Sequence, residues 1–421
     1  MDTLILLDEL KNRGFISKVS DESNLESILL NSDITVYCGF DPTSNSLHVG
    51  HLLPLLCLQW FQKYGHKIVI LVGYATSLIG DPSFKSQERK LGIPTHMLNW
   101  SSQISQQIVD FFEKNNLCSP IIVNNYDWFK KINVIDFLRD IGKFFSINKM
   151  ISRKSVEMRI NRAGQGISFT EFSYNLLQSY DFLQLYKKHQ VMLQIGGSDQ
   201  WGNISSGINL VRRIFHKQVF GLTVPLLTQD NGIKFGKTEN NKIIWLDSNR
   251  TTPYAFFQFW LNISDTQVYS FLKLFTFLKI SEIDQLKRSL ENINDAKLLL
   301  AELITKMVHG INQVNAVKRI TQSLFGGNIM DLTKSDFLQL KKDGIPYFNL
   351  NSGINFLKHI LVQSHLCSSI SESKRVISGF GIKINGKKVM NPEYLFCKDD
   401  QIFSKYTILS KGKKNHLLLC W

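Results

Sequence analysis

Two histidines beside a glycine could bind the phosphates of a nucleotide. The segment 42–51 reads PTSNSLHVGH and follows an apolar run that ends at Cys38. A helix that begins near His48 would direct free backbone N–H groups and the positive end of its dipole toward an anion. Gly50 allows a phosphate or a flat ring to approach the backbone, and the imidazoles of His48 and His51 can donate to phosphate oxygens. The pattern indicates a nucleotide site, although helix-start histidines without a ligand would look the same in isolation.

Two lysines lie on a second short segment, 234–238, which reads KFGKT. Lys234 and Lys237 are three residues apart around a glycine, and an ammonium group on a flexible stem suits a clamp on pyrophosphate. The segment does not match a phosphate-binding P-loop, because that motif requires glycine at position 231, where the chain has asparagine. An ordinary basic loop is the remaining alternative.

Two further segments carry polar groups at spacings that suit a small ligand. Tyr174, Gln178 and Asp181 are four and three residues apart, so on a helix they share one face. A phenol, an amide and a carboxylate together would bind a small polar molecule, whereas an exposed polar helix face is the alternative. The segment 196–202, GGSDQWG, follows an apolar run, and Asp199 within it could bind ribose hydroxyls.

Short β-rich runs alternate with helical patterns in the first half of the chain. The predicted strands are 34–38, 68–72, 121–123 and 191–195. Strands separated by helices are typical of βαβ units in a parallel sheet, whose ligands bind beyond the carboxyl ends of the strands. The sequence therefore predicts an α/β domain with its site in the loops after these strands.

The second half of the chain has a different pattern. Apolar residues at spacings of three and four predict helices from 252 to 325. A smaller unit begins near Gly353, with two helices followed by a hairpin over 382–389. The Asn385-Gly386 pair in that hairpin suits a tight two-residue turn.

Composition and charge limit the classes of function. The chain has 421 residues, of which 43% are hydrophobic and 20% charged, and its net charge is +14. These values are typical of a folded protein of two or three domains rather than a disordered chain. The basic excess fits a polyanionic partner, although a protein without such a partner can carry it. Between 354 and 421 there are eleven basic and four acidic residues, which favours a nucleic-acid backbone over a solvated basic surface.

The compartment is also indicated by the sequence. The N-terminus lacks a basic region before an apolar stretch, and apolar runs such as 68–72 are too short to span a bilayer. The six cysteines are scattered without a Cys-x-x-Cys pair, which argues against a disulfide framework and a structural zinc site. We therefore expect a cytoplasmic protein that has neither a membrane partner nor zinc.

Taken together, the motifs resemble those of the bacterial tyrosyl-tRNA synthetases, a family of class I aminoacyl-tRNA synthetases. HVGH at 48–51 is similar to the HIGH signature, and KFGKT at 234–238 is similar to the KMSKS segment. The remaining similar phrases, in the family's order and spacing, are YCGFDPT at 37–43, GDPS at 80–83, 174–181 and 196–202. The resemblance covers nearly the whole chain.

This resemblance implies a fold in several domains. The expected class is α/β, with a Rossmann-like parallel-sheet catalytic domain, an α-helical domain and a small α+β C-terminal RNA-binding domain of the S-four type. The expected boundaries are 1–225 for the catalytic domain, 226–330 for the lysine segment and the helical anticodon-side domain, 331–352 for a linker, and 353–421 for the RNA-binding domain.

The resemblance also implies roles for individual residues. The expected tyrosine-binding residues are Tyr37, Asp81, Tyr174, Gln178, Asp181 and Gln200. The residues expected to bind ATP or the adenylate are Cys38, Gly39, Asp41, Gly50, Gly197, Asp199 and Lys237. The residues expected to act on the phosphates are Thr43, His48, His51, Lys85, Arg89, Lys234, Lys237 and Thr238.

The activity implied by the resemblance is that of a tyrosine–tRNA ligase. Its substrates would be L-tyrosine, ATP with Mg²⁺ and tRNA(Tyr), and the family acts as a homodimer. The chain departs from the family pattern at Pro54, Phe84 and Thr238. Two other hypotheses are a structural RNA-binding protein derived from such an enzyme, which degraded motifs would favour, and a nucleotidyltransferase for another small acid, which leaves the C-terminal unit unexplained. Buried partners for a phenol hydroxyl would reject phenylalanine without an editing domain, an inference for which this family itself is the standard example.

Overall fold

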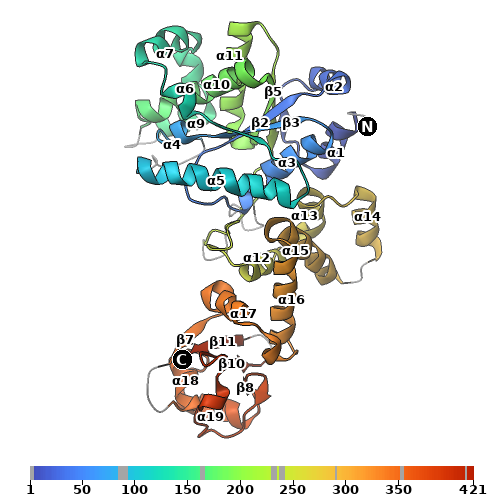
Figure 1. The fold of residues 1–421 in the computed structure, drawn as a ribbon, viewed down its shortest axis with the longest axis vertical. Helices are drawn as coiled ribbons and strands as arrows, with labels where there is room; N and C mark the ends of the chain where they lie inside the picture. The colour runs from blue at the N-terminus through green and yellow to red at the C-terminus, as the bar shows by residue number, and fades with distance from the viewer. Residues whose placement is uncertain are drawn as a thin grey trace. The chain divides into compact units, whose positions relative to one another are not determined.

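A computed structural model describes residues 4–83, 93–161, 166–228, 235–236, 242–289, 292–350, 355–412 and 415–421 of the chain. The chain forms two compact units (Figure 1). Unit 1 comprises Met1–Asp247 and Ile263–Ala296, and unit 2 comprises Ser248–Asn262 and Lys297–Trp421.

Unit 1 is built on a six-stranded sheet in the order β1-β6-β5-β2-β3-β4. The strands pair in parallel except at the edge, where β1 runs antiparallel to β6. The prediction of a parallel sheet is confirmed, and the structure adds β1 and β6 to the four predicted strands. The strands are β1 (Lys18–Val19), β2 (Thr35–Phe40), β3 (Lys67–Val72), β4 (Ile121–Asn124), β5 (Val191–Gly197) and β6 (Phe220–Val224).

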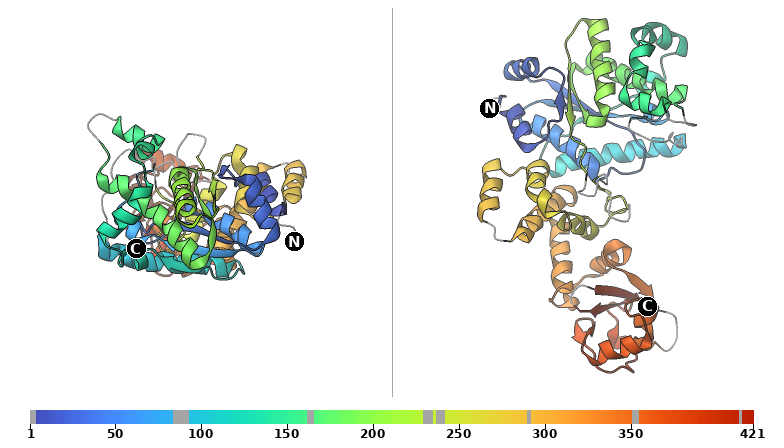
Figure 2. Two further views of the ribbon diagram at one scale, coloured as in Figure 1. Left: turned by 90° about the horizontal axis from the view of Figure 1, so that it is seen from above. Right: turned by 180° about the vertical axis from the view of Figure 1, so that it is seen from behind.

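Helices cover both faces of this sheet, with α10 and α11 on one face and α3 and α5 on the other (Figures 1 and 2). The described helices of unit 1 are α1 (Leu4–Arg13), α2 (Glu22–Asn31), α3 (Leu52–Lys63), α4 (Tyr74–Ser77), α5 (Pro94–Lys114), α6 (Tyr126–Phe129), α7 (Val134–Asp140), α8 (Ile147–Ile151), α9 (Lys154–Ile160), α10 (Phe169–His189), α11 (Trp201–Phe215), α13 (Val268–Phe275) and α14 (Ile280–Ser289). Short 3₁₀ turns over Val49–His51 and Ser198–Gln200 lead into α3 and α11.

The core under α10 and α11 fixes where the polar face of α10 lies. Phe182 and Leu185 are buried there against strand residues such as Tyr37 and Val69. The Ser168 side chain accepts a hydrogen bond from the Glu171 backbone and so caps the start of α10. Because residues 174, 178 and 181 lie at helical spacing, packing of the apolar stripe turns them together toward the carboxyl ends of the strands.

Unit 2 contains a five-stranded sheet in the order β7-β11-β10-β8-β9. Its strands are β7 (Tyr347–Asn349), β8 (Ile382–Ile384), β9 (Lys387–Lys388), β10 (Tyr406–Lys411) and β11 (Asn415–Cys420). The predicted hairpin is confirmed as β8 and β9, and Asn385 and Gly386 between them have φ of 45° and 84°. Those left-handed values are what a two-residue hairpin turn requires.

The helices of unit 2 are α12 (Pro253–Leu261), most of α15 (Ile293–His309), α16 (Ile311–Leu324), α17 (Lys334–Gln339), α18 (Leu357–Gln363) and α19 (Ile370–Ser378). The segment 331–352, which the sequence suggested as a linker, contains α17 and β7, and β7 pairs in parallel with β11. None of the helices that the structure describes has the length and apolar character needed to cross a membrane.

Candidate active site

A pocket of about 520 Å³ opens at the carboxyl ends of β2 and β5 in unit 1. Every predicted site residue that the structure describes lines it: Tyr37, Cys38, Gly39, Asp41, Thr43, His48, Gly50, His51, Asp81, Tyr174, Gln178, Asp181, Gly197, Asp199 and Gln200. The other predicted residues lie outside the described part of the chain: Lys85, Arg89, Lys234, Lys237 and Thr238.

One end of the pocket is formed by Tyr37 of β2 and Asp181 of α10. Asp181 is 1% exposed and accepts hydrogen bonds from Trp128 Nε1 at 2.8 Å and Asn125 Nδ2 at 3.2 Å. The Tyr37 hydroxyl is buried and has no hydrogen-bond partner among the described residues. A buried hydroxyl without a partner is costly, so this end is suited to a ligand that supplies one.

The electrostatics of this end follow from burial. Desolvation raises the pKa of the Asp181 carboxyl well above its usual range, whereas the hydrogen bonds from Asn125 and Trp128 act in the opposite direction. Burial and the nearby Asp181 also raise the pKa of the Tyr37 phenol, which therefore stays protonated at neutral pH. A carboxyl group and a phenol thus face a space that could hold another hydroxyl group.

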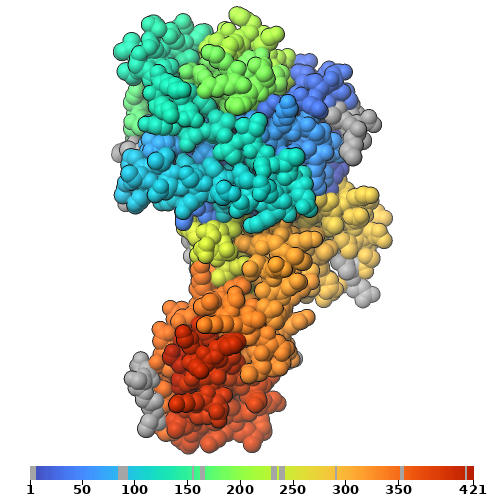
Figure 3. Space-filling view, in the orientation of Figure 1, coloured from blue at the N-terminus to red at the C-terminus, as the bar shows by residue number. Residues whose placement is uncertain are grey.

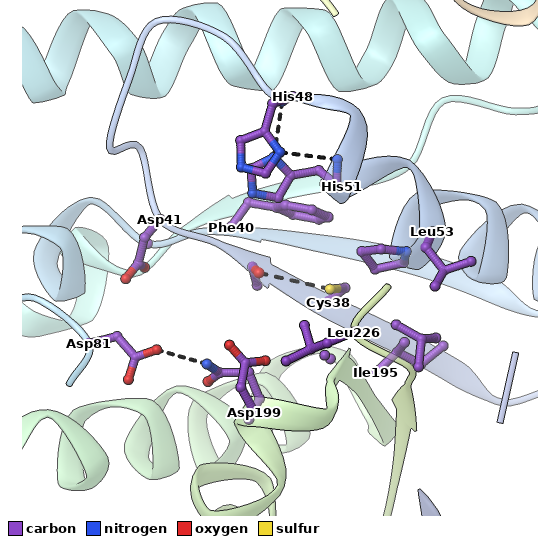
Figure 4. Close-up of a pocket in the computed structure, with 18 of the residues that line it drawn as sticks. Cys38, Phe40, Asp41, His48, His51, Leu53, Asp81, Ile195, Asp199 and Leu226 are labelled. Atoms are coloured by element: carbon purple, nitrogen blue, oxygen red, sulfur yellow. Dashed lines mark hydrogen bonds between the residues drawn. The ribbon is translucent and has the colours of Figure 1, made fainter. Parts of the chain in front are cut away.

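Two acidic residues lie across the pocket from the imidazoles (Figure 4). Asp41 accepts hydrogen bonds from Tyr174 Oη at 2.7 Å and from Thr76 Oγ1 at 2.8 Å. Asp81 accepts one from Gln200 Nε2 at 2.7 Å. The Gln178 side-chain oxygen is buried and has no partner among the described residues, so acceptors are available for a positively charged group.

The histidine motif forms a compact turn before α3, with the two imidazole centroids 3.9 Å apart. His48 Nδ1 accepts from the Gly50 backbone N–H at 3.1 Å, and His51 Nδ1 accepts from the His48 backbone N–H at 3.1 Å. A neutral imidazole whose Nδ1 accepts a hydrogen bond carries its proton on Nε2. Burial lowers the pKa of His51 well below its usual range, so His51 is a neutral Nε2–H donor at pH 7.

The middle of the lysine segment is held against the histidine motif. The Phe235 ring packs against Phe271 and Phe275 of α13, with centroids 4.8 and 5.9 Å away. The Gly236 carbonyl accepts from the Ile244 N–H at 2.9 Å, and the Ile244 carbonyl accepts from the Val49 N–H at 3.0 Å. These contacts link the two signature segments through the backbone.

Glycines keep the pocket open where backbone and side chains meet closely. A Cβ at Gly197 would lie 2.5 Å from Asp199 Oδ1, and one at Gly73 would lie 2.1 Å from Asp41 Oδ1. Both distances are too short for non-bonded atoms, so larger residues would displace these carboxylates. Gly73 was not recognised from the sequence.

Three other side chains of the site were not predicted from the sequence. Asn125 and Trp128 position Asp181, and Thr76 positions Asp41. Asn125 and Thr76 follow the carboxyl ends of β4 and β3, and that position could have revealed them. Two arginines of unit 1, Arg153 and Arg159, have partners within that unit. Arg159 is 4% exposed and pairs with Glu171 at 2.9 Å, and Arg153 donates to Ser206.

Among the described residues, no group of three or more histidine, cysteine, aspartate or glutamate side chains is arranged to hold a metal ion.

Comparison with known proteins places the chain in a defined group. The family model described as tRNA synthetases class I (W and Y) matches residues 30–326, and that of the tyrosine–tRNA ligase SYY-like C-terminal domain matches 336–419. The chain is 52% identical to the tyrosine–tRNA ligase of Pectobacterium atrosepticum, over 99% of this chain and 98% of that protein. It is also 52% identical to the tyrosine–tRNA ligase of Buchnera aphidicola over the full length of both. A solved structure of a C-terminally truncated mitochondrial tyrosyl-tRNA synthetase from Aspergillus nidulans has a TM-score of 0.68 and 30% identity, covering 76% of this chain and 94% of that one.

Proposed function

The chain belongs to the class I tyrosyl-tRNA synthetases, and we propose on that premise that it joins L-tyrosine to ATP and then transfers the tyrosyl group to tRNA(Tyr). The observation that carries the proposal is the buried pair of Tyr37 and Asp181 in the same pocket as the HVGH turn. The test is exchange of labelled pyrophosphate into ATP with each amino acid in turn. Tyrosine should support exchange, and exchange with tryptophan instead of tyrosine would refute the specificity.

In this proposal, separate residues of the pocket bind the hydroxyl, the ammonium group and the carboxylate of tyrosine. Tyr37 and Asp181 bind the substrate hydroxyl, which gives the unpartnered Tyr37 group its partner. The ammonium group at the opposite end of the amino acid is bound by Tyr174, Gln178 and Asp81. Gln200 lies near the carboxylate.

The ATP-binding part lies around the ends of β2 and β5. Asp199 and Gly197 contact the ribose with Cys38, while Gly39, Gly50 and Asp41 lie near the nucleotide. Thr43, His48 and His51 meet the phosphates. Lys85, Arg89, Lys234, Lys237 and Thr238 complete the phosphate-binding set from outside the described residues. ATP enters as its Mg²⁺ complex.

The chemistry is attack by the tyrosine carboxylate on the α-phosphorus of ATP, which breaks the bond to pyrophosphate. No protein nucleophile takes part, so rate enhancement comes from positioning and from donors that stabilise charge on the phosphorus and the leaving group. The imidazoles of His48 and His51 suit this role, because their Nδ1 atoms accept backbone hydrogen bonds and their Nε2 atoms are left as donors for phosphate oxygens. In the second step a ribose hydroxyl of the tRNA attacks the tyrosyl carbonyl and AMP leaves.

The domain division of the proposal assigns the adenylate chemistry to 1–225, the lysine segment and anticodon-side helices to 226–330, and RNA binding to 353–421. The match of the C-terminal family domain to 336–419 supports the last assignment. We further propose that the protein works in the cytoplasm.

A chain that ends at Ile345 should separate the two steps. This end point removes β7 together with β11, its partner, and leaves the contacts of Asp343 with Thr252 in place. Pyrophosphate exchange should stay within about twofold of the full chain, whereas kcat/KM for charging should fall about hundredfold at moderate salt because backbone contacts to the tRNA are lost. Equal losses in both assays would contradict the division.

We propose that the protein is a homodimer. Large apolar side chains are exposed across the segment 121–169 of unit 1, which we call the apolar surface and which includes the teal region at the upper left of Figure 3. Its members are Ile121, Tyr126, Val134, Ile135, Leu138, Ile147, Ile151, Met158, Ile160 and Phe169. Many exposed apolar side chains in one segment are typical of a surface that another chain covers.

Replacing Ile135 with glutamate should convert the dimer to a monomer. Ile135 is 66% exposed, so the substitution leaves the core intact while it places a charge in the proposed interface. Sedimentation equilibrium should give a mass close to one chain, against two for the unaltered protein. The matched control is Ile311→Glu on α16, an isoleucine that is 52% exposed outside this surface, and it should remain a dimer. A dimeric Ile135→Glu variant would locate the interface elsewhere.

A further inference from the structure

A second cavity of about 450 Å³ lies beside the first pocket in unit 1. The two cavities share Asp199, and the second also contains Ser83 and Asn203, which contact the Asp81–Gln200 pair of the first. Helix α10 supplies both: residues 174, 178 and 181 line the first cavity, and 171, 172 and 175 line the second. The second cavity therefore adjoins the place where the tyrosine carboxylate is proposed to lie.

Asn175 lines this cavity with a buried side-chain amide that makes no hydrogen bond to the described residues. Its side chain is 6% exposed, and neither its Nδ2 nor its Oδ1 atom has a hydrogen-bond partner among the described residues. A buried amide without partners is unfavourable, so this position is suited to a ligand that supplies a donor and an acceptor. One turn away, Glu171 is 1% exposed and its Oε1 atom is likewise without a partner in the described chain.

The other walls of the cavity suit a nucleotide. Trp201 contributes an indole ring, with Lys18 Nζ 4.3 Å from its centroid. Arg153 adds a guanidinium group. An aromatic face stacks on a base, and cations attract a phosphate. The side-chain amide of asparagine can donate and accept at the same time, which matches the amino group and ring nitrogen on one edge of adenine.

We propose that the second cavity binds adenosine, namely the 3′-terminal adenosine of the tRNA, with its base on Asn175. This inference rests on the proposed function, because the second reaction step needs a ribose hydroxyl of that adenosine next to the tyrosyl carbonyl. A free adenine nucleotide offers the same base. The position of the cavity favours the terminal adenosine. The first pocket is already assigned to ATP, and the second cavity adjoins the carboxylate end of the amino acid.

The test compares Asn175→Ala with the unaltered protein in two assays. Pyrophosphate exchange, which does not involve tRNA, should remain within twofold, and this result also shows that the variant is folded. Transfer from preformed enzyme-bound tyrosyl-adenylate to tRNA in a single turnover should slow about tenfold, from the lost base contact. The matched control is Asn209→Ala, an exposed asparagine on α11, which should leave both rates unchanged.

A modified tRNA then identifies the base. A tRNA that ends in purine riboside lacks the terminal 6-amino group, and the unaltered enzyme should transfer to it about tenfold more slowly than to normal tRNA. With Asn175→Ala the two tRNAs should react at the same rate. An equal penalty in both proteins would overturn the proposal, as would loss of exchange and transfer together.

The remaining outcomes show whether the adenosine belongs to tRNA or to a free nucleotide. They also distinguish failure of the adenosine site from failure of the proposed function. A changed ATP dependence of exchange in Asn175→Ala would mean that the cavity takes a free nucleotide, and would overturn the assignment to tRNA. Absence of tyrosine-dependent exchange in the unaltered protein would refute the proposed function itself. That failure is distinct from a normal exchange rate with transfer unaffected by Asn175→Ala, which refutes only the adenosine site.

Discussion

Replacement of Asp181 with alanine should lower kcat/KM for tyrosine activation by about 10²–10³-fold, a loss of about 3–4 kcal/mol. The substitution removes the acceptor proposed for the substrate hydroxyl. It also leaves the buried N–H groups of Asn125 and Trp128, which donate to Asp181 at 3.2 and 2.8 Å, without their acceptor. The second cost arises because a buried donor without a partner loses its full hydration energy.

The measurement is pyrophosphate exchange at varied tyrosine concentration with ATP saturating. Because the loss concerns the amino acid, the dependence on ATP should change little. Asp284→Ala on α14, which removes a half-exposed aspartate, is the control and should behave like the unaltered protein. Near-normal exchange by Asp181→Ala would rule out its role in tyrosine binding.

The same site explains the expected discrimination against phenylalanine. Phenylalanine would leave both the Tyr37 hydroxyl and Asp181 without a ligand hydroxyl in a buried space. Tyr37→Phe should therefore weaken tyrosine activation less than Asp181→Ala does, because it removes a group that lacks a partner and creates no new unpaired donor.

Local spacing was sufficient to predict the part of the site that lies on single elements. Tyr174, Gln178 and Asp181 line one pocket because helical geometry fixes their common face regardless of the rest of the fold. The HVGH turn was likewise predictable, because it ends the loop that follows β2, a strand with a strong apolar pattern. In both cases the determining interactions are close in sequence.

Contacts between distant segments were not predictable in this way. Asn125 and Trp128 donate to Asp181 from positions 56 and 53 residues away in the sequence. The residues next to them in the sequence do not indicate that partner. Arg159 shows the same limit: a charged side chain is typical of an exposed position, whereas its pairing with Glu171 makes it an internal residue. The short edge strand β1 has two residues, too few for a periodic pattern to identify it.

Substitution of Gly50 with alanine should lower kcat/KM for ATP by about 10²-fold, the scale of losing one well-placed donor to a phosphate in the transition state. A Cβ at this position would lie 2.9 Å from His48 Cε1 and 3.0 Å from His48 Nδ1. The imidazole must therefore move, and it loses the 3.1 Å hydrogen bond from the Gly50 N–H that fixes its orientation. Stability should change little, because Gly50 is exposed.

The measurement is exchange at varied ATP with tyrosine saturating, together with thermal unfolding. Gly142→Ala is the matched control, because a Cβ there meets only Leu138 at ordinary contact distances of 3.9 and 4.0 Å. A Gly50→Ala variant with unchanged ATP kinetics would show that His48 does not need this orientation. A selective loss toward ATP, with tyrosine binding retained, would instead assign the glycine of the HVGH turn to placing an imidazole donor, in addition to any role in letting the nucleotide approach the backbone.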